Sequence, residues 1–138
     1  MSEPLAIIPL AEATTRMSSV LGFEPRALTP DEITVRLPSF AWASLADWEL
    51  LDDHDIAKQT GLLREPLMGD LLIVTEVSFG AGGGAFFLEG SSLGTFIDSH
   101  LLRYGECFFN GDVIILALEG REVWLFHHEG VYMHAMLT

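Results

Sequence analysis

Five carboxylates fall within nine residues in the run DWELLDDHD at positions 47–55. Like charges this close repel one another in an isolated helix, so the run favours a purpose beyond helix stability. Trp48 lies among the acids and Trp42 precedes them, a composition typical of surfaces that attract and anchor a basic protein. The alternative is a solvated acidic face whose tryptophans point into the core. The run lacks the glycine of a calcium loop, and no carboxyl group is set apart for acid–base catalysis.

Histidines near the C-terminus are the second feature with possible chemistry. If Glu129 and Gly130 form a two-residue hairpin loop, His127 lies across from Tyr132 on one face of the sheet, with His134 as a diagonal neighbour. A metal or proton-transfer site is one interpretation, and a half-buried polar patch is the other. Neighbouring strand residues point to opposite faces, so His128 is expected to be separated from His127. His-His-Glu is therefore not a zinc motif.

Cys107 is the only cysteine, which excludes an internal disulfide within this sequence and is typical of a reducing compartment. A cysteine with histidines elsewhere in the chain, such as His100, is a candidate nucleophile. The neighbouring Phe108 and Phe109 instead favour a buried structural thiol. Both interpretations stay open from the sequence.

The N-terminal half contains signals for both helices and strands. Residues 10–21 predict a helix ended by Gly22, and residues 32–37 (EITVRL) alternate as a strand between two prolines. Residues 39–63 predict one or two short helices. The residues expected to share one face of this segment are Trp42, Leu45, Trp48, Leu51 and Ile56.

The middle of the chain predicts two strands and the clearest helix. Residues 71–79 have the composition of a central strand, and the glycines at 80–84 turn the chain. This glycine run is no phosphate loop, because strand-like residues 85–88 follow it and no lysine is near. A helix over residues 92–104 follows, capped by Ser91 or Ser92 and ended by Gly105. Its expected apolar stripe consists of Leu93, Phe96, Ile97, Leu101 and Tyr104.

The last third predicts a β-meander of three strands, at residues 112–118, 122–128 and 131–137. Two-residue turns would place Trp124 opposite Ile115 and Ala135, and Phe126 opposite Val113 and Met133. The sequence therefore predicts a single α+β domain over residues 1–138. We expect a mainly antiparallel sheet that ends in a β-meander, with helices packed on it.

The charge of the chain limits its partners. Seven basic residues against 20 acidic ones give a formal charge of −13, which repels nucleic acids and anionic membranes and attracts basic proteins. The N-terminal residues lack the basic region of a signal peptide, and no apolar run is long enough to span a membrane. We expect a cytoplasmic protein without a cofactor or bound metal.

In size, charge and α+β pattern, the chain resembles the acidic immunity proteins encoded beside bacterial polymorphic and contact-dependent toxins. The segments DWELLDDHD and WLFHHEGVY are the candidate contact regions. The resemblance covers general properties of the whole chain and transfers no functional residue. It implies an inhibitor that occludes a basic toxin or enzyme. The expected partner-binding residues are Asp47, Trp48, Glu49, Asp52, Asp53, Asp55, His127, Glu129 and Tyr132.

Two other classes of function stay open. A small enzyme would use Cys107 with a histidine, or the predicted patch of His127, Tyr132 and His134. A homodimeric adaptor would pair through the outer edge of the last strand, at residues 131–137.

Overall fold

The computed structural model describes residues 6–37 and 41–137. Within them the chain forms an antiparallel sheet with the strand order β1-β4-β3-β5-β6-β7-β2. The strands are β1 (Ala6–Ile8), β2 (Ala43–Ser44), β3 (Asp70–Val74), β4 (Ala85–Glu89), β5 (Val113–Ala117), β6 (Glu122–His127) and β7 (Val131–Met136). The helices are α1 (Leu10–Leu21), α2 (Pro30–Thr34), α3 (Asp53–Gln59) and α4 (Leu93–Tyr104). This architecture confirms the predicted α+β class and the C-terminal β-meander.

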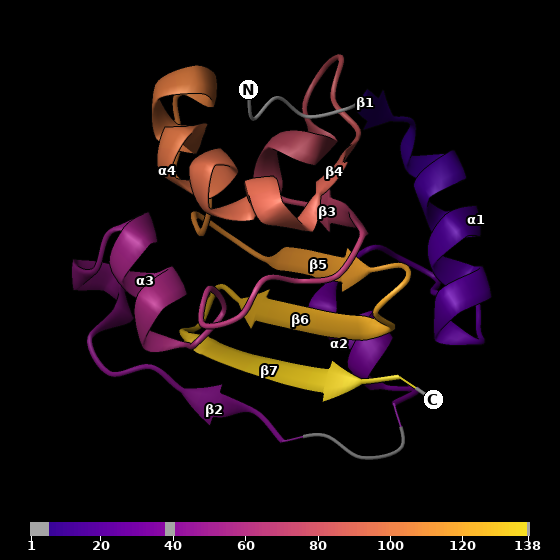
Figure 1. Ribbon diagram of the computed structural model, residues 1–138, viewed down its shortest axis with the longest axis horizontal. Helices are drawn as coiled ribbons and strands as arrows, with labels where there is room; N and C mark the ends of the chain where they lie inside the picture. The colour runs from indigo at the N-terminus through magenta and orange to yellow at the C-terminus, as the bar shows by residue number, and fades with distance from the viewer. Residues whose placement is uncertain (1–5, 38–40, 138) are drawn as a thin grey trace.

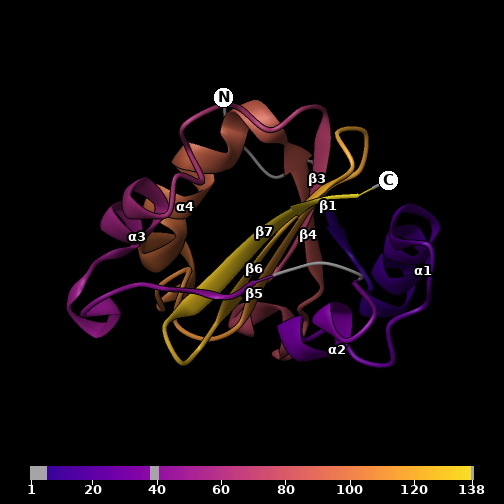
Figure 2. The same ribbon diagram turned by 90° about the horizontal axis from the view of Figure 1, so that it is seen from below.

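The sheet is the middle of three layers. Figure 2 shows it between α3 and α4 on one side and α1 and α2 on the other. Each side has its own hydrophobic core, one around Phe86, Phe96 and Trp124 and the other around Met17 and Leu125. The central strands β3 and β5 are buried on both faces, which explains their continuous apolar sequences. No helix in the described ranges is long and apolar enough to cross a membrane.

The first helix follows the prediction, whereas the second element does not. Helix α1 covers the predicted residues 10–21 and ends at Gly22, whose φ of 85° is the left-handed conformation that favours glycine. The predicted strand at residues 32–37 is wrong, because this region begins with α2 (Figure 1). Thr29 caps the helix by accepting a hydrogen bond from the Glu32 amide, and Pro30 occupies the first helical position. These start signals outweigh the alternating pattern.

The segment before β3 contains the expected short helical elements. They are the 3-10 turn η1 (Trp48–Leu50) and α3, while positions 39 and 40 lie outside the described residues. Leu45, Trp48 and Leu51 pack against the same core as Ile56. Trp42 instead packs against the opposite core, so the prediction that it shares their face is wrong. The extended strand β2 separates the two sets at the edge of the sheet.

The predicted strand at residues 71–79 is central but shorter than expected. Strand β3 ends at Val74, and the 3-10 turn η2 (Glu76–Phe79) follows. The Thr75 amide donates a hydrogen bond to Ser78 Oγ, which fixes this turn. The glycine run then returns the chain to β4, beside β3, as predicted.

Helix α4 has nearly the predicted bounds, and most of its predicted apolar stripe is buried as expected. It ends at Gly105, which has a φ of 80°. The 3-10 turn η3 (Gly90–Ser92) leads into it, and Ser92 makes no side-chain cap hydrogen bond. Leu101, expected in the apolar stripe, is 52% exposed, while His100 is buried instead. This single exchange brings a titratable side chain into the core.

The register of the β-meander matches the prediction in its first hairpin only. Trp124 pairs with Ile115 and Phe126 pairs with Val113, as expected. In the second hairpin Trp124 pairs with His134 and Phe126 with Tyr132, so the predicted pairs with Ala135 and Met133 are wrong. The turn between β6 and β7 has three residues, 128–130, and Gly130 adopts a left-handed φ of 83°. The extra residue shifts the pairing by one position.

The imidazole of His100 is enclosed by the aromatic rings of Phe86, Phe96, Tyr104 and Phe108. Its Nδ1 lies 2.8 Å from the Glu106 carbonyl oxygen, which only accepts, so Nδ1 carries the proton. Nε2 is buried without a partner. Burial lowers the pKa of His100, although the Glu106 carbonyl and nearby carboxylates oppose this. At neutral pH the folded state therefore holds a neutral imidazole.

We expect His100 to make folding stability depend on pH. Its folded pKa lies below the unfolded value near 6.5, so the unfolded chain binds the proton first. Its contribution is complete above that value and is lost as the pH falls below it. His100→Asn keeps a donor for the Glu106 carbonyl and does not titrate. Urea unfolding at about pH 7 and pH 5.5 should show a smaller loss of stability in this variant than in the wild type.

His54→Asn is the matched control, because the His54 side chain is 60% exposed. This control should lose as much stability as the wild type over the same pH interval. An equal loss in His100→Asn would show that His100 does not carry the effect.

Candidate functional site

An open cleft of about 520 Å³ lies between the start of α3 and one face of α4. Figures 1 and 2 show these two helices side by side on the same face of the sheet. The cleft is lined by Asp52, Asp53, His54, Asp98, Leu101 and Cys107. The acidic run thus meets a further acid and an exposed leucine that lie more than forty positions away in the sequence. We call this feature the acidic cleft.

The acids at the start of α3 have a local structural cause. Asp52 is the N-cap residue, and its Oδ1 accepts a hydrogen bond of 2.8 Å from the Asp55 amide. Asp53 and Asp55 occupy the first turn, where the partial positive charge of the helix N-terminus favours carboxylates. Part of the acidic run is therefore explained by helix capping rather than by a partner.

Asp53 has a second structural role inside the protein. Its side chain is buried, and its two oxygens accept hydrogen bonds from the Phe108 amide at 2.7 Å and the Phe109 amide at 3.1 Å. These bonds tie the loop after α4 to the start of α3. They also hold Phe108 and Phe109 in the core.

Asp47 and Glu49 lie outside these internal hydrogen bonds. Both are exposed, on and just before η1. Trp48 between them is half-buried and packs against the core on the α3–α4 side. A Cβ atom added to Gly130 would clash with the indole, so the tryptophan lies directly against the β6–β7 turn. Trp48 therefore joins η1 to the sheet.

The predicted patch of His127, Tyr132 and His134 is wrong. The one-residue shift in register places Tyr132 and His134 on the same face as Phe126 and Trp124, toward α3 and α4. His127 lies on the opposite face, where its Nε2 is 3.4 Å from Asp31 Oδ2 on α2. Glu129, the other expected contact in this region, is exposed in the turn.

Sequence reasoning missed a groove of about 370 Å³ on the Trp124 face. His134 stacks on the Trp124 ring at 4.2 Å, and its Nε2 lies 2.6 Å from Glu122 Oε2. Tyr132 and Arg64 also line the groove, and Trp124 Nε1 is buried without a partner. The length of the β6–β7 turn was the signal that would have placed His134 here.

Cys107 is exposed at the acidic cleft and not buried as its phenylalanine neighbours suggested. Partial burial of the thiol and the charges of Asp53, Asp52 and Glu106 raise the pKa of Cys107. A nucleophilic cysteine needs a lowered pKa, because the thiolate is the reactive form. The surroundings of Cys107 therefore oppose a catalytic role.

The expected open edge of the last strand is covered in part. Strand β2 pairs with β7 through Ala43 opposite Tyr132 and Ser44 opposite Val131. Pairing of β7 with a second copy of the chain would have to avoid or displace this short strand.

Comparison with protein-family models, with curated proteins and with solved structures found no match.

We expect Asp53→Asn to destabilise the protein by about 1.5–3 kcal/mol, because an amide group accepts only one of the two backbone hydrogen bonds and loses the charge. Glu49→Gln is the control, since it neutralises an exposed acid of the same run and should change stability by less than about 0.5 kcal/mol. Urea unfolding at neutral pH measures both values. Equal stabilities of the two variants would contradict the structural role of Asp53.

Proposed function

We propose that this protein is a small acidic binding module that captures a basic protein. The contact surface consists of the acidic cleft together with the flanking acids Asp47 and Glu49. By its size and charge we assign it to the inhibitors of basic toxins or enzymes, the class to which acidic immunity proteins belong. It would act by occluding the cationic active site of its partner.

The observation that carries this proposal is the composition of the acidic cleft. Asp52, Asp53 and Asp98 line it, and neither lysine nor arginine is among its lining residues. Leu101, 52% exposed, adds apolar surface beside the carboxylates. Acids around an apolar contact supply both long-range attraction and short-range burial for a basic partner.

The charge of the whole chain supports the same partner class. A formal charge of −13 raises the local concentration of cationic proteins and speeds their association. It also opposes binding to nucleic acid, so the expected partner is the basic protein itself.

We expect the exposed acids outside the start of α3 to control association. Asp47→Asn, Glu49→Gln and Asp98→Asn together should lower the association rate with the basic partner by roughly tenfold at low salt, with little effect at high salt. This set omits Asp52 and Asp53, because their removal would disturb α3. The natural probe is the product of the neighbouring gene, co-expressed and purified, with rates measured by surface plasmon resonance.

A matched control removes three exposed acids elsewhere, with Gln at Glu12, Glu24 and Glu119. It changes the net charge equally and should slow association much less. If both triple variants associate equally fast, the acidic cleft is not the contact surface. If the neighbouring product forms no complex with the wild-type chain, the inhibitor assignment fails for that partner.

A small enzyme is the second candidate, and the groove above Trp124 favours it. The 2.6 Å contact orients His134 through Glu122, as a carboxylate orients a general base. The volume of about 370 Å³ is in the range of small-molecule sites.

If the groove is catalytic, purified protein should turn over p-nitrophenyl acyl or phosphate esters, and His134→Gln should abolish this activity. His54→Gln should leave it unchanged, because His54 lies at the acidic cleft. Absence of turnover, or equal turnover in both variants, would remove this candidate.

A further inference from the structure

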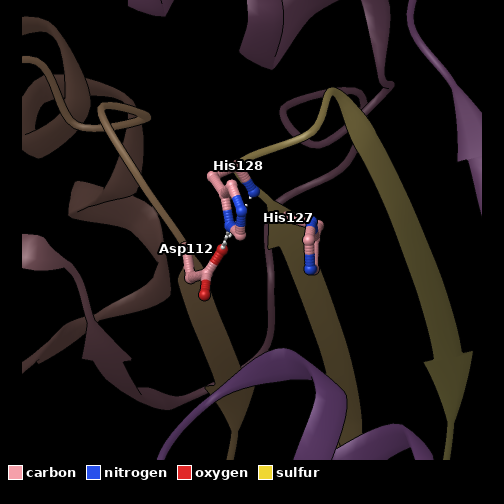
Figure 3. Close-up of side chains that lie close together, drawn as sticks. All are labelled: Asp112, His127 and His128. Carbon is pink, nitrogen blue, oxygen red and sulfur yellow. Dashed lines mark hydrogen bonds and ion pairs between the residues drawn. The ribbon is translucent and has the colours of Figure 1, made fainter.

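Two histidines and an aspartate gather where β5 begins and β6 ends. Asp112 directly precedes β5, His127 is the last residue of β6, and His128 is the first residue of the turn (Figure 3). One potential ligand atom from each residue lies within 4.8 Å of the other two. We call these three residues the His127–His128 cluster.

The turn explains why adjacent histidines lie on the same side. The strand alternation that would separate them stops at His127, because the three-residue turn begins at His128. Asp112 Oδ1 accepts a hydrogen bond from the His128 amide at 2.9 Å and lies 2.8 Å from His128 Nδ1. The two imidazole rings consequently stack with their centroids 4.2 Å apart. The expectation that His128 is separated from His127 is therefore wrong.

Further carboxylates surround this cluster. His127 Nε2 lies 3.4 Å from Asp31 Oδ2, and His127 Nδ1 lies 3.9 Å from Glu129 Oε1. Each nitrogen of His127 therefore has a carboxylate near it. The Glu129 amide donates a hydrogen bond of 3.2 Å to His127 Nδ1, so Nδ1 has a lone pair and Nε2 carries the proton toward Asp31. An ion bound at Nδ1 displaces this amide, while Nε2 donates to a carboxylate, as the second nitrogen of a metal-bound histidine usually does.

We propose that Asp112, His127 and His128 bind one divalent transition-metal ion of the zinc class. Two imidazole nitrogens and one carboxylate oxygen form the donor set typical of zinc sites that leave a fourth position open. Glu129 or water fills that position. The site is independent of the basic partner proposed above.

Binding requires a local rearrangement that the turn permits. The stacked rings lie within 26° of parallel, so their lone pairs do not converge. The His127 side chain is 11% exposed and is held between Trp42 and α2, whereas the His128 side chain is 57% exposed. The ion is therefore bound by rotation of His128 toward a fixed His127, while Asp112 keeps its position.

Calorimetric titration of the full chain, stripped with chelator, with Zn²⁺ and separately with Ni²⁺ tests this proposal. We expect one ion per chain, and an affinity at least tenfold lower in His128→Ala and in His127→Gln. His54→Ala is the matched control and should bind as the wild type does, although its imidazole also lies beside a carboxylate, at 3.5 Å from Asp98.

Thermal unfolding followed by circular dichroism separates loss of the site from loss of the fold. Zn²⁺ should raise the melting temperature of the wild type and of His54→Ala but not that of His128→Ala, which alters only an exposed side chain of the turn. If His127→Gln fails to fold, His128→Ala still decides the outcome. Unchanged stoichiometry and affinity in His128→Ala, or no binding of either metal at millimolar concentration, would overturn the proposal.

Discussion

The buried carboxylate of Asp53 is the interaction on which the α3–α4 side of the molecule depends. A charged group in an apolar layer is costly unless hydrogen bonds satisfy it, and here two backbone amides of the loop after α4 do so. The same bonds place Phe108 and Phe109 in the core. They also fix the loop that presents Cys107 at the acidic cleft and leads to Asp112 before β5. One side chain thus positions parts of two candidate sites.

The sequence predicted those elements whose signals are local. Helix α1 and helix α4 each end at a glycine that adopts the left-handed conformation, and the apolar periodicity of α4 is clear. The strand predicted at residues 32–37 failed because two local signals conflicted there. Alternation favoured a strand, while Thr29 and Pro30 favoured a helix start, and the helix formed. The helix-start residues outweigh a six-residue alternation here.

The candidate sites were less predictable because they depend on contacts between distant segments and on one turn. Nothing local links the acids at the start of α3 to Asp98 and Leu101, which reach the same cleft only after α4 packs beside α3. The positions of the histidines depend on the length of one turn. A single extra residue in the β6–β7 turn exchanges the neighbours of every side chain on β7. It places His134 over Trp124 and leaves His127 beside His128.

Some of the acidic side chains form hydrogen bonds that stabilise the fold, and others do not. Asp52 caps α3, Asp53 holds the loop after α4, and Asp112 fixes the β6–β7 turn. Asp47 and Glu49 are exposed, just before and on η1, and neither caps α3. Repulsion among unpaired acids destabilises the folded chain, so folding alone gives no reason to keep them. The cationic partner that we propose would supply that reason, because the same repulsion is relieved when opposite charges reach the surface.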